Sequence, residues 1–195
     1  MSLSTSKTRK KLIDVSRELF ALRGKKNITM NDIAEASKKG RRTLYTYFKN
    51  KDEVYKAVIE NELNLVIIAL EENAKKAIDA FEKLRNHIII HLDLIKQSVT
   101  RNGTLRADFF KDIYEVERSR RKMDVIELKI IRNILDEGLA TGKFKTMDTE
   151  IASSIIMYSL KGLEIPYIRQ NLTSEFEKNK HEIVEFVLNG ISMES

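Results

Sequence analysis

The chain has no cysteine and no tryptophan, and only one of its 195 residues is a proline. Without cysteine, disulfide bonds and thiolate metal sites are excluded, which suits a reducing cytoplasm. The single proline, Pro166, leaves most of the chain free to form helices. The longest apolar run, Leu65–Leu70, is too short to cross a membrane, and the opening MSLSTSKTRKK lacks a signal peptide's apolar core. We therefore expect a soluble, cytoplasmic, mainly helical protein with no membrane partner.

Formal charge is divided unevenly along the chain. Residues 1–51 hold fourteen Lys and Arg against four Asp and Glu, a net charge of +10, whereas the whole chain has only +6. A basic module joined to an acidic one is typical of proteins that neutralise nucleic-acid phosphates with one domain. We expect a basic domain over 1–51 and a second domain over 52–195. An anionic membrane surface is less favoured, because these basic residues do not flank one large apolar face.

The stretch Ile28–Val54 predicts two short helices, a tight turn between them and the start of a long third helix. Thr29 and Asp32 have the spacing of a capping box, which predicts a helix that begins at Met30. The residues between the two helices are polar and end in Gly40. Glycine suits a turn and is an acceptable N-cap for the second helix. This arrangement is typical of a helix-turn-helix.

The second of these helices has one apolar face and one basic face. Leu44 and Phe48 lie four residues apart, so they share the side that would pack on the first helix. The outer side carries Arg41, Arg42, Tyr45, Thr46 and Lys49. In a major groove, Arg can bond guanine bidentately and Thr can contact the thymine methyl group. A solvated face on an ordinary helical hairpin is the alternative interpretation.

These residues give a first set of predicted DNA contacts. For base edges or their close surroundings we predict Arg41, Arg42, Thr43 and Thr46. For a phosphate contact we predict Thr29, at the start of the first helix.

The triplet DIA at 32–34, an eight-residue gap and the run TLYTYFKNKDE at 43–53 resemble the DNA-binding signature of TetR-type repressors. The resemblance covers about the first quarter of the chain. It implies phosphate contacts from Tyr45, Tyr47 and Lys51, together with a homodimer and a small-molecule effector. The chain departs from the family pattern at the turn, where Lys38 and Lys39 replace a glycine and an apolar residue. A second segment, DEGLATGKF at 136–144, also resembles the family.

Helical periodicity continues through the remaining chain. We predict helices over 52–76, 77–99, 105–117, 119–140, 149–165 and 174–188, the fifth ending at Pro166 and the sixth before Gly190. The last two are apolar on more than one side, so each needs two neighbours. This pattern favours a second protomer, and the family resemblance implies a dimer through these two helices. A central helix in a monomeric core is the alternative.

His87 and His91 lie one helical turn apart, a spacing that can hold a metal. No third ligand and no metalloprotease signature accompany them, so packing in the core or in a cavity wall is favoured and no metal is predicted. Candidate residues for an effector cavity are Phe81, His91, Phe109, Phe110, Tyr114 and Met123. No catalytic motif is present, so we expect no catalytic residue, no enzyme activity and no cofactor.

The sequence therefore predicts an all-α fold. An N-terminal three-helix helix-turn-helix domain would bind double-stranded operator DNA, and a C-terminal helical domain would bind an unknown small-molecule effector and dimerise. The predicted function is that of a ligand-responsive repressor that binds a palindromic operator as a homodimer. The competing hypothesis is a helical protein-interaction module whose basic surface docks an acidic protein.

Overall fold

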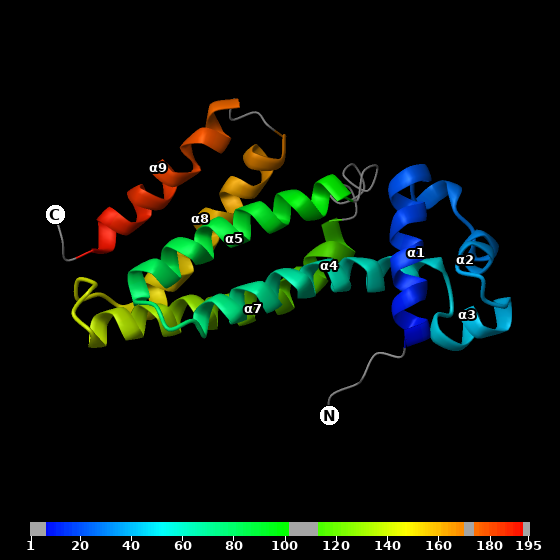
Figure 1. Cartoon of the computed structure of the whole chain (residues 1–195), viewed down its shortest axis with the longest axis horizontal. Helices are drawn as coiled ribbons and strands as arrows, with labels where there is room; N and C mark the ends of the chain where they lie inside the picture. The colour runs from blue at the N-terminus through cyan, green and yellow to red at the C-terminus, as the bar shows by residue number, and fades with distance from the viewer. Residues whose placement is uncertain (1–6, 102–112, 170–173, 193–195) are drawn as a thin grey trace. The chain divides into compact units, whose positions relative to one another are not determined.

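The computed structural model describes residues 7–101, 113–169 and 174–192 (Figure 1). The helices are α1 (Lys7–Arg23), α2 (Met30–Ala36), α3 (Arg41–Tyr47), α4 (Lys51–Ala74), α5 (Ala80–Arg101), α7 (Ile113–Ala140), α8 (Thr149–Arg169) and α9 (Ser174–Ile191), with a 3-10 turn η1 (Lys25–Asn27) after α1. Across these ranges the sole β pairing is an isolated bridge between Phe144 and Ser192. The predicted all-α class is confirmed.

The chain divides into two compact units. One comprises Met1–Leu63 and Ser98–Arg120, and the other comprises Asn64–Gln97 and Arg121–Ser195. The helices α4, α5 and α7 each contribute residues to both units. As predicted, α4 is one uninterrupted helix and no flexible linker follows the helix-turn-helix (Figure 1). The functional division after residue 51 stays a prediction.

The first unit buries the apolar sides of α1 to α4 around a common core. Phe20 of α1 and Tyr55 of α4 are fully buried, and their rings meet edge to face with centroids 5.8 Å apart. Ile33 of α2 and Leu44 of α3 are buried completely as well. This core fixes the backs of α2 and α3, and so determines which of their residues remain outside.

The second unit combines an apolar core with ion pairs between helices. Lys83 of α5 donates from Nζ to both carboxylate oxygens of Glu137 on α7, at 2.8 and 2.7 Å. Lys161 of α8 lies 2.6 Å from the Asp124 carboxylate of α7. The fully or almost fully buried apolar side chains include Leu84, Ile88, Leu92, Ile131, Leu135, Val184 and Leu188.

Three predicted helix ends were wrong. α7 runs without a break through the predicted boundary at 117–119, α8 continues past Pro166 to Arg169, and α9 includes Gly190. Caps, prolines and glycines are local preferences: a proline removes one backbone donor, and a glycine costs a helix about 1 kcal/mol. Packing of the long flanking helices outweighs these terms. In addition, α5 extends to Arg101, which places Thr100 inside the helix rather than in the predicted loop.

Candidate nucleic-acid interface

The start of α2 is fixed by a capping box, as predicted. The Thr29 hydroxyl accepts a hydrogen bond from the Asp32 backbone N–H at 3.2 Å, and the Asp32 carboxylate accepts from the Thr29 backbone N–H at 2.7 Å. Hydrogen bonds from the Thr29 hydroxyl and N–H hold the pKa of Asp32 below its usual value. Ile28 and Ile33, which flank this cap at the two positions of a hydrophobic staple, are both fully buried. These contacts define how the chain enters α2.

The turn between α2 and α3 contains the one non-glycine residue with a positive φ among the described residues. This residue is Lys38, with a φ of 53°. Gly40 follows in an extended conformation and N-caps α3 without a side-chain hydrogen bond. The predicted cap is therefore confirmed, and the left-handed position lies two residues before it.

The two faces of α3 are as the sequence predicts. Leu44 is fully buried and Phe48, the C-cap residue, is 3% exposed. The Arg9 guanidinium of α1 lies over the Phe48 ring, 5.2 Å from its centroid. This contact ties the start of α1 to the end of α3.

The exposed face of α3 contains most of the predicted DNA-contacting residues. Exposed side chains are those of Arg41, Arg42, Tyr45 and Thr46, and half-buried ones are those of Thr43 and Tyr47. The Thr46 hydroxyl donates to the Arg42 carbonyl oxygen at 2.9 Å. With its hydroxyl satisfied by the helix backbone, Thr46 can present its methyl group outward.

The junction between α3 and α4 is also capped. The Asn50 side-chain oxygen accepts from the Glu53 backbone N–H at 2.9 Å, and the Glu53 carboxylate accepts from the Lys49 backbone N–H at 2.7 Å. Thr29, the predicted phosphate contact at the other end of the motif, is exposed. Both ends of the helix-turn-helix are therefore held by side chain to backbone hydrogen bonds.

Lys51, another predicted phosphate contact, has a structural partner. Its Nζ donates to the Lys25 carbonyl oxygen in η1 at 2.7 Å. Lys25 in turn lies 3.0 Å from the Asp52 carboxylate, and its ammonium is 4.2 Å from the centroid of the Tyr55 ring. An ammonium has three donors, and this bond uses one of the three. No periodic pattern in the sequence singled out Lys25, which fixes η1 against α4.

A buried carboxylate joins α1 to α4 and α5 within the first unit. Glu62 of α4 is 1% exposed, and its carboxylate lies 3.5 Å from the Arg17 guanidinium of α1. Its other oxygen accepts from the Ser98 hydroxyl of α5 at 3.0 Å. Sequence reasoning missed this contact because its members are 45 and 36 residues apart. It gives α1 and α4 a polar connection to α5.

Inside the second unit, two histidines and two glutamates form a buried cluster, which we call the His–Glu cluster. His91 of α5 lies 2.6 Å through Nδ1 from Glu127 of α7 and 3.1 Å through Nε2 from Glu164 of α8. His87 lies 3.1 Å through Nε2 from the same Glu127 oxygen. All four side chains are at most 3% exposed. His91 is thus a satisfied core histidine, one of the two favoured interpretations.

The charges within the cluster follow from this geometry. Burial by itself lowers the pKa of His91, but the charge of Glu127 and hydrogen bonds to both carboxylates outweigh it and raise that pKa to about 9. Burial likewise raises the pKa of Glu127, and the neighbouring His91 charge reverses this and holds it well below its usual range. His87 Nδ1 is buried and has no hydrogen-bond partner among the described residues. Over the described residues, no group of ligating side chains fits a metal ion.

Three residues of the predicted effector-cavity set have described side chains. His91 and Met123 are buried, and Phe81 is half-buried with the Arg85 guanidinium 5.3 Å from its ring centroid. Phe109, Phe110 and the side chain of Tyr114 lie outside the described part of the chain. Their assignment to a cavity stays a prediction.

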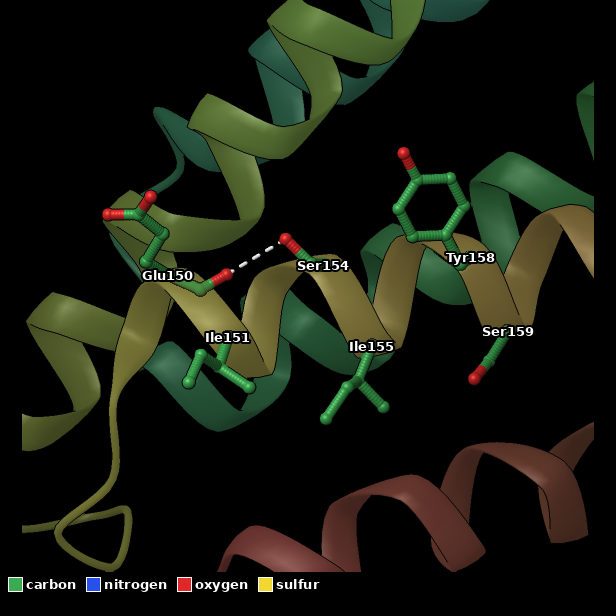
Figure 2. A pocket seen from close by; sticks show the side chains of 6 residues that line it. All are labelled: Glu150, Ile151, Ser154, Ile155, Tyr158 and Ser159. Carbon is green, nitrogen blue, oxygen red and sulfur yellow. Dashed lines mark hydrogen bonds between the residues drawn. The ribbon is translucent and has the colours of Figure 1, made fainter.

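A separate apolar surface lies on α8. Ile151, Ile155 and Tyr158 are 60 to 63% exposed and line an open hollow of about 650 Å³, together with Glu150, Ser154 and Ser159. Figure 2 shows Ile151 and Ile155 projecting from the same side of α8, one turn apart. On α9, Phe186 is 83% exposed. We call Ile151, Ile155, Tyr158 and Phe186 the α8–α9 apolar surface.

A capped helix, a tight turn and a short helix with a buried apolar back and an exposed basic front together define a helix-turn-helix protein. A family model described as "Bacterial regulatory proteins, tetR family" matches residues 12–58. The fatty acid metabolism regulator protein of Bacillus subtilis (strain 168) is 22% identical over 181 residues, which cover 92% of this chain and 93% of that protein. The family model over the N-terminal helices and this relative along the chain together support a TetR family transcriptional regulator.

Solved structures share the fold along nearly the whole chain. A transcriptional regulator from Cytophaga hutchinsonii ATCC 33406 has a TM-score of 0.78 at 23% identity, with 94% of this chain and 98% of that one covered. The regulator FadR from Bacillus subtilis, solved in complex with stearoyl-CoA, has a TM-score of 0.67 at 21% identity, with 93% and 98% covered. In the part of the chain that the structure describes, no helix is long and apolar enough to traverse a lipid bilayer.

Proposed function

We propose that this regulator is a cytoplasmic, ligand-responsive repressor that binds a palindromic operator as a homodimer. The observation that carries the proposal is the orientation of α3, whose Leu44 and Phe48 are buried while Arg41, Arg42, Tyr45 and Thr46 are exposed. A helix held by its back in this way can enter a major groove without losing its packing.

The proposed DNA contacts separate by chemistry. Arg41, Arg42, Thr43 and Thr46 read base edges or lie close to them, because guanidinium groups and methyl groups distinguish base pairs in the major groove. Thr29, Tyr45, Tyr47 and Lys51 hold phosphates, which set the position of the motif but not its sequence preference.

The α8–α9 apolar surface supports the proposed homodimer. Four large apolar side chains that are more than half exposed lie on two helices that are contiguous in the chain. Three of them, Ile151, Ile155 and Tyr158, line one hollow on α8, and an exposed apolar patch of this kind is typical of a protein–protein interface. In a twofold dimer, the same surface of each protomer meets its copy, and two recognition helices can then bind half-sites about 34–36 Å apart.

The proposed effector response needs a physical connection between the domains. α4 passes from the helix-turn-helix into the second unit without interruption, and Glu62 on that helix pairs with Arg17 of α1 and Ser98 of α5. Effector binding would favour a dimer in which the recognition helices no longer match the half-site spacing. By linkage, operator DNA must then weaken effector binding by the same factor.

A long-chain acyl-CoA is the first effector to test. Relatives include a fatty acid metabolism regulator and a FadR solved with stearoyl-CoA. Calorimetric titration of the chain with stearoyl-CoA, with and without operator, checks the linkage. Equal affinity in both titrations rejects the switch, whereas no binding in either rejects this effector alone.

Selection of bound sequences from random duplex DNA tests the proposed function. The expected result is a palindrome whose half-sites are one helical turn apart. The competing hypothesis is a basic surface that docks an acidic protein. In that case no DNA sequence should be enriched, and unlabelled polyanions of equal total charge should abolish the binding of DNA.

A further inference from the structure

The end of α2 is a Schellman motif with an unusual residue at its left-handed position. The Lys38 backbone N–H donates to the Glu35 carbonyl at 2.9 Å, and the Lys39 N–H donates to the Ala34 carbonyl at 3.0 Å. These are the two bonds of the motif, and they require the residue that follows the C-cap to be left-handed. That residue is Lys38, with a φ of 53°.

The end of α7 has the same motif with the usual residue. The Gly142 N–H donates to the Leu139 carbonyl at 3.1 Å, and the Lys143 N–H donates to the Gly138 carbonyl at 2.9 Å. Gly142 has a φ of 69°. A Cβ added there would meet no atom within 4 Å. The chain therefore provides one glycine and one lysine at equivalent backbone positions.

Lysine at this position is unfavourable for the fold. Glycine adopts the left-handed conformation freely because it has no Cβ, and Asn or Asp can offset the strain with a local side-chain hydrogen bond. Lysine has neither property. The Lys38 side chain is exposed, and its ammonium makes no ion pair or hydrogen bond within the described ranges. The folded protomer alone therefore gains nothing from a lysine here.

We propose that Lys38 is a phosphate contact of the DNA complex, in addition to the eight DNA contacts that the sequence suggested. The inference rests on the proposed DNA-binding function. In a helix-turn-helix, the first helix crosses the phosphate backbone and the second lies in the groove, so the turn between them passes close to phosphates. Lys38 lies in that turn, three residues before Arg41, and carries a free cation.

Three variants test the charge and the backbone strain of Lys38 against the position of that residue. Lys38→Gly removes both, and Lys38→Arg keeps both. Gly142→Lys is the matched control, because it introduces the same strain and charge at the equivalent position of α7, where a Cβ meets open space. The measurements are thermal unfolding and the affinity for a short duplex of random sequence as a function of salt concentration.

The inference predicts opposite effects on stability and on DNA binding. Lys38→Gly should raise the Tm by about 2–4 °C and weaken binding to every duplex. The slope of log K against log salt should fall by about 0.9 for each bound protomer. Lys38→Arg should match the wild type in both measurements. Gly142→Lys should lower the Tm by a similar amount and leave the affinity and the salt slope unchanged.

A Lys38→Gly variant with the wild-type salt slope would overturn the role of Lys38 while leaving the proposed function intact. An equal change of slope in Gly142→Lys would also overturn it, because the effect would then reflect net charge rather than position. If the wild type binds no duplex at low salt, the proposed function and the role of Lys38 both fall.

Discussion

At the scale of single residues, Arg42 is the sharpest test of base reading. Its side chain is exposed on α3. The Thr46 hydroxyl donates to the backbone carbonyl oxygen of Arg42 and not to its side chain. Arg42→Ala should weaken binding to the selected operator by about 1–3 kcal/mol and barely affect binding to random DNA. Competition binding with both duplexes checks this. An equal loss of affinity for the operator and for random DNA would reassign Arg42 to a phosphate contact.

His91 should make stability depend on pH. Because its pKa is raised from 6.5 to about 9, protonation stabilises the folded state. This contribution is complete below about pH 6.5 and is lost as the pH rises through about 9. His91→Gln should remove that dependence and lower stability by about 3–5 kcal/mol, since Glu127 and Glu164 then lose their buried cation.

Denaturant unfolding at several pH values measures this effect of His91. The exposed His181, replaced by Gln, is the control and should retain the wild-type profile. A His91→Gln variant that loses stability equally at pH 6 and pH 10 would contradict the assigned charge. If that variant does not fold, the wild-type pH profile still decides, because it must show the decline between pH 6.5 and 9.

At the scale of elements, the helix-turn-helix was predictable because its signals are local. Thr29 and Asp32 are three residues apart, and so are Asn50 and Glu53, and each pair forms the backbone hydrogen bonds that its spacing indicates. The sequence made no prediction about a positive φ. Gly40 is the predicted cap of α3, and the left-handed conformation falls on Lys38, because the Schellman bonds of α2 fix its position.

The end of α7 shows an element that depends on a missing side chain. A Cβ at Gly138 would overlap the ring of Phe144, which is 3% exposed. Gly138→Ala should therefore destabilise the chain by about 1–3 kcal/mol. The double variant Gly138→Ala/Phe144→Leu should lose less free energy of unfolding than the sum of the losses in the two single variants. Chemical denaturation measures these free energies. Strict additivity would show that the two residues do not compete for space.

Long helices were predicted well in their centres and poorly at their ends. The expected ends at Pro166 and Gly190 are absent, and α7 continues through the residues 117–119. A cap or a breaker changes the free energy by about 1 kcal/mol for a glycine and about 3 kcal/mol for a proline. Tertiary packing along helices of 18 to 28 residues supplies more than that, and the sequence of one segment does not reveal its neighbours.

At the scale of the whole molecule, the proposed dimer should dissociate when a charged residue is introduced into the α8–α9 apolar surface. Ile155→Glu should raise the dimer dissociation constant by roughly 30-fold, which corresponds to about 2 kcal/mol. Its protomer should remain folded, because the side chain is 62% exposed. Sedimentation velocity measures the effect. Leu22→Glu on α1 replaces a side chain that is 78% exposed and should leave the mass unchanged.

The sequence by itself determined the helical class, the basic first module and the two faces of α3. These properties follow from composition and from residues three or four positions apart, which a helix brings onto one side. It also placed His87 and His91 one turn apart and left their role open.

Tertiary structure decided which distant charges meet. Glu127 and Glu164 close on His91 from α7 and α8, and Glu62 joins Arg17 to Ser98. The structure also decided that Lys51 bonds the η1 backbone and that Lys38 has a left-handed conformation. Such contacts depend on how helices pack, and no spacing along one helix encodes the partner that another helix presents.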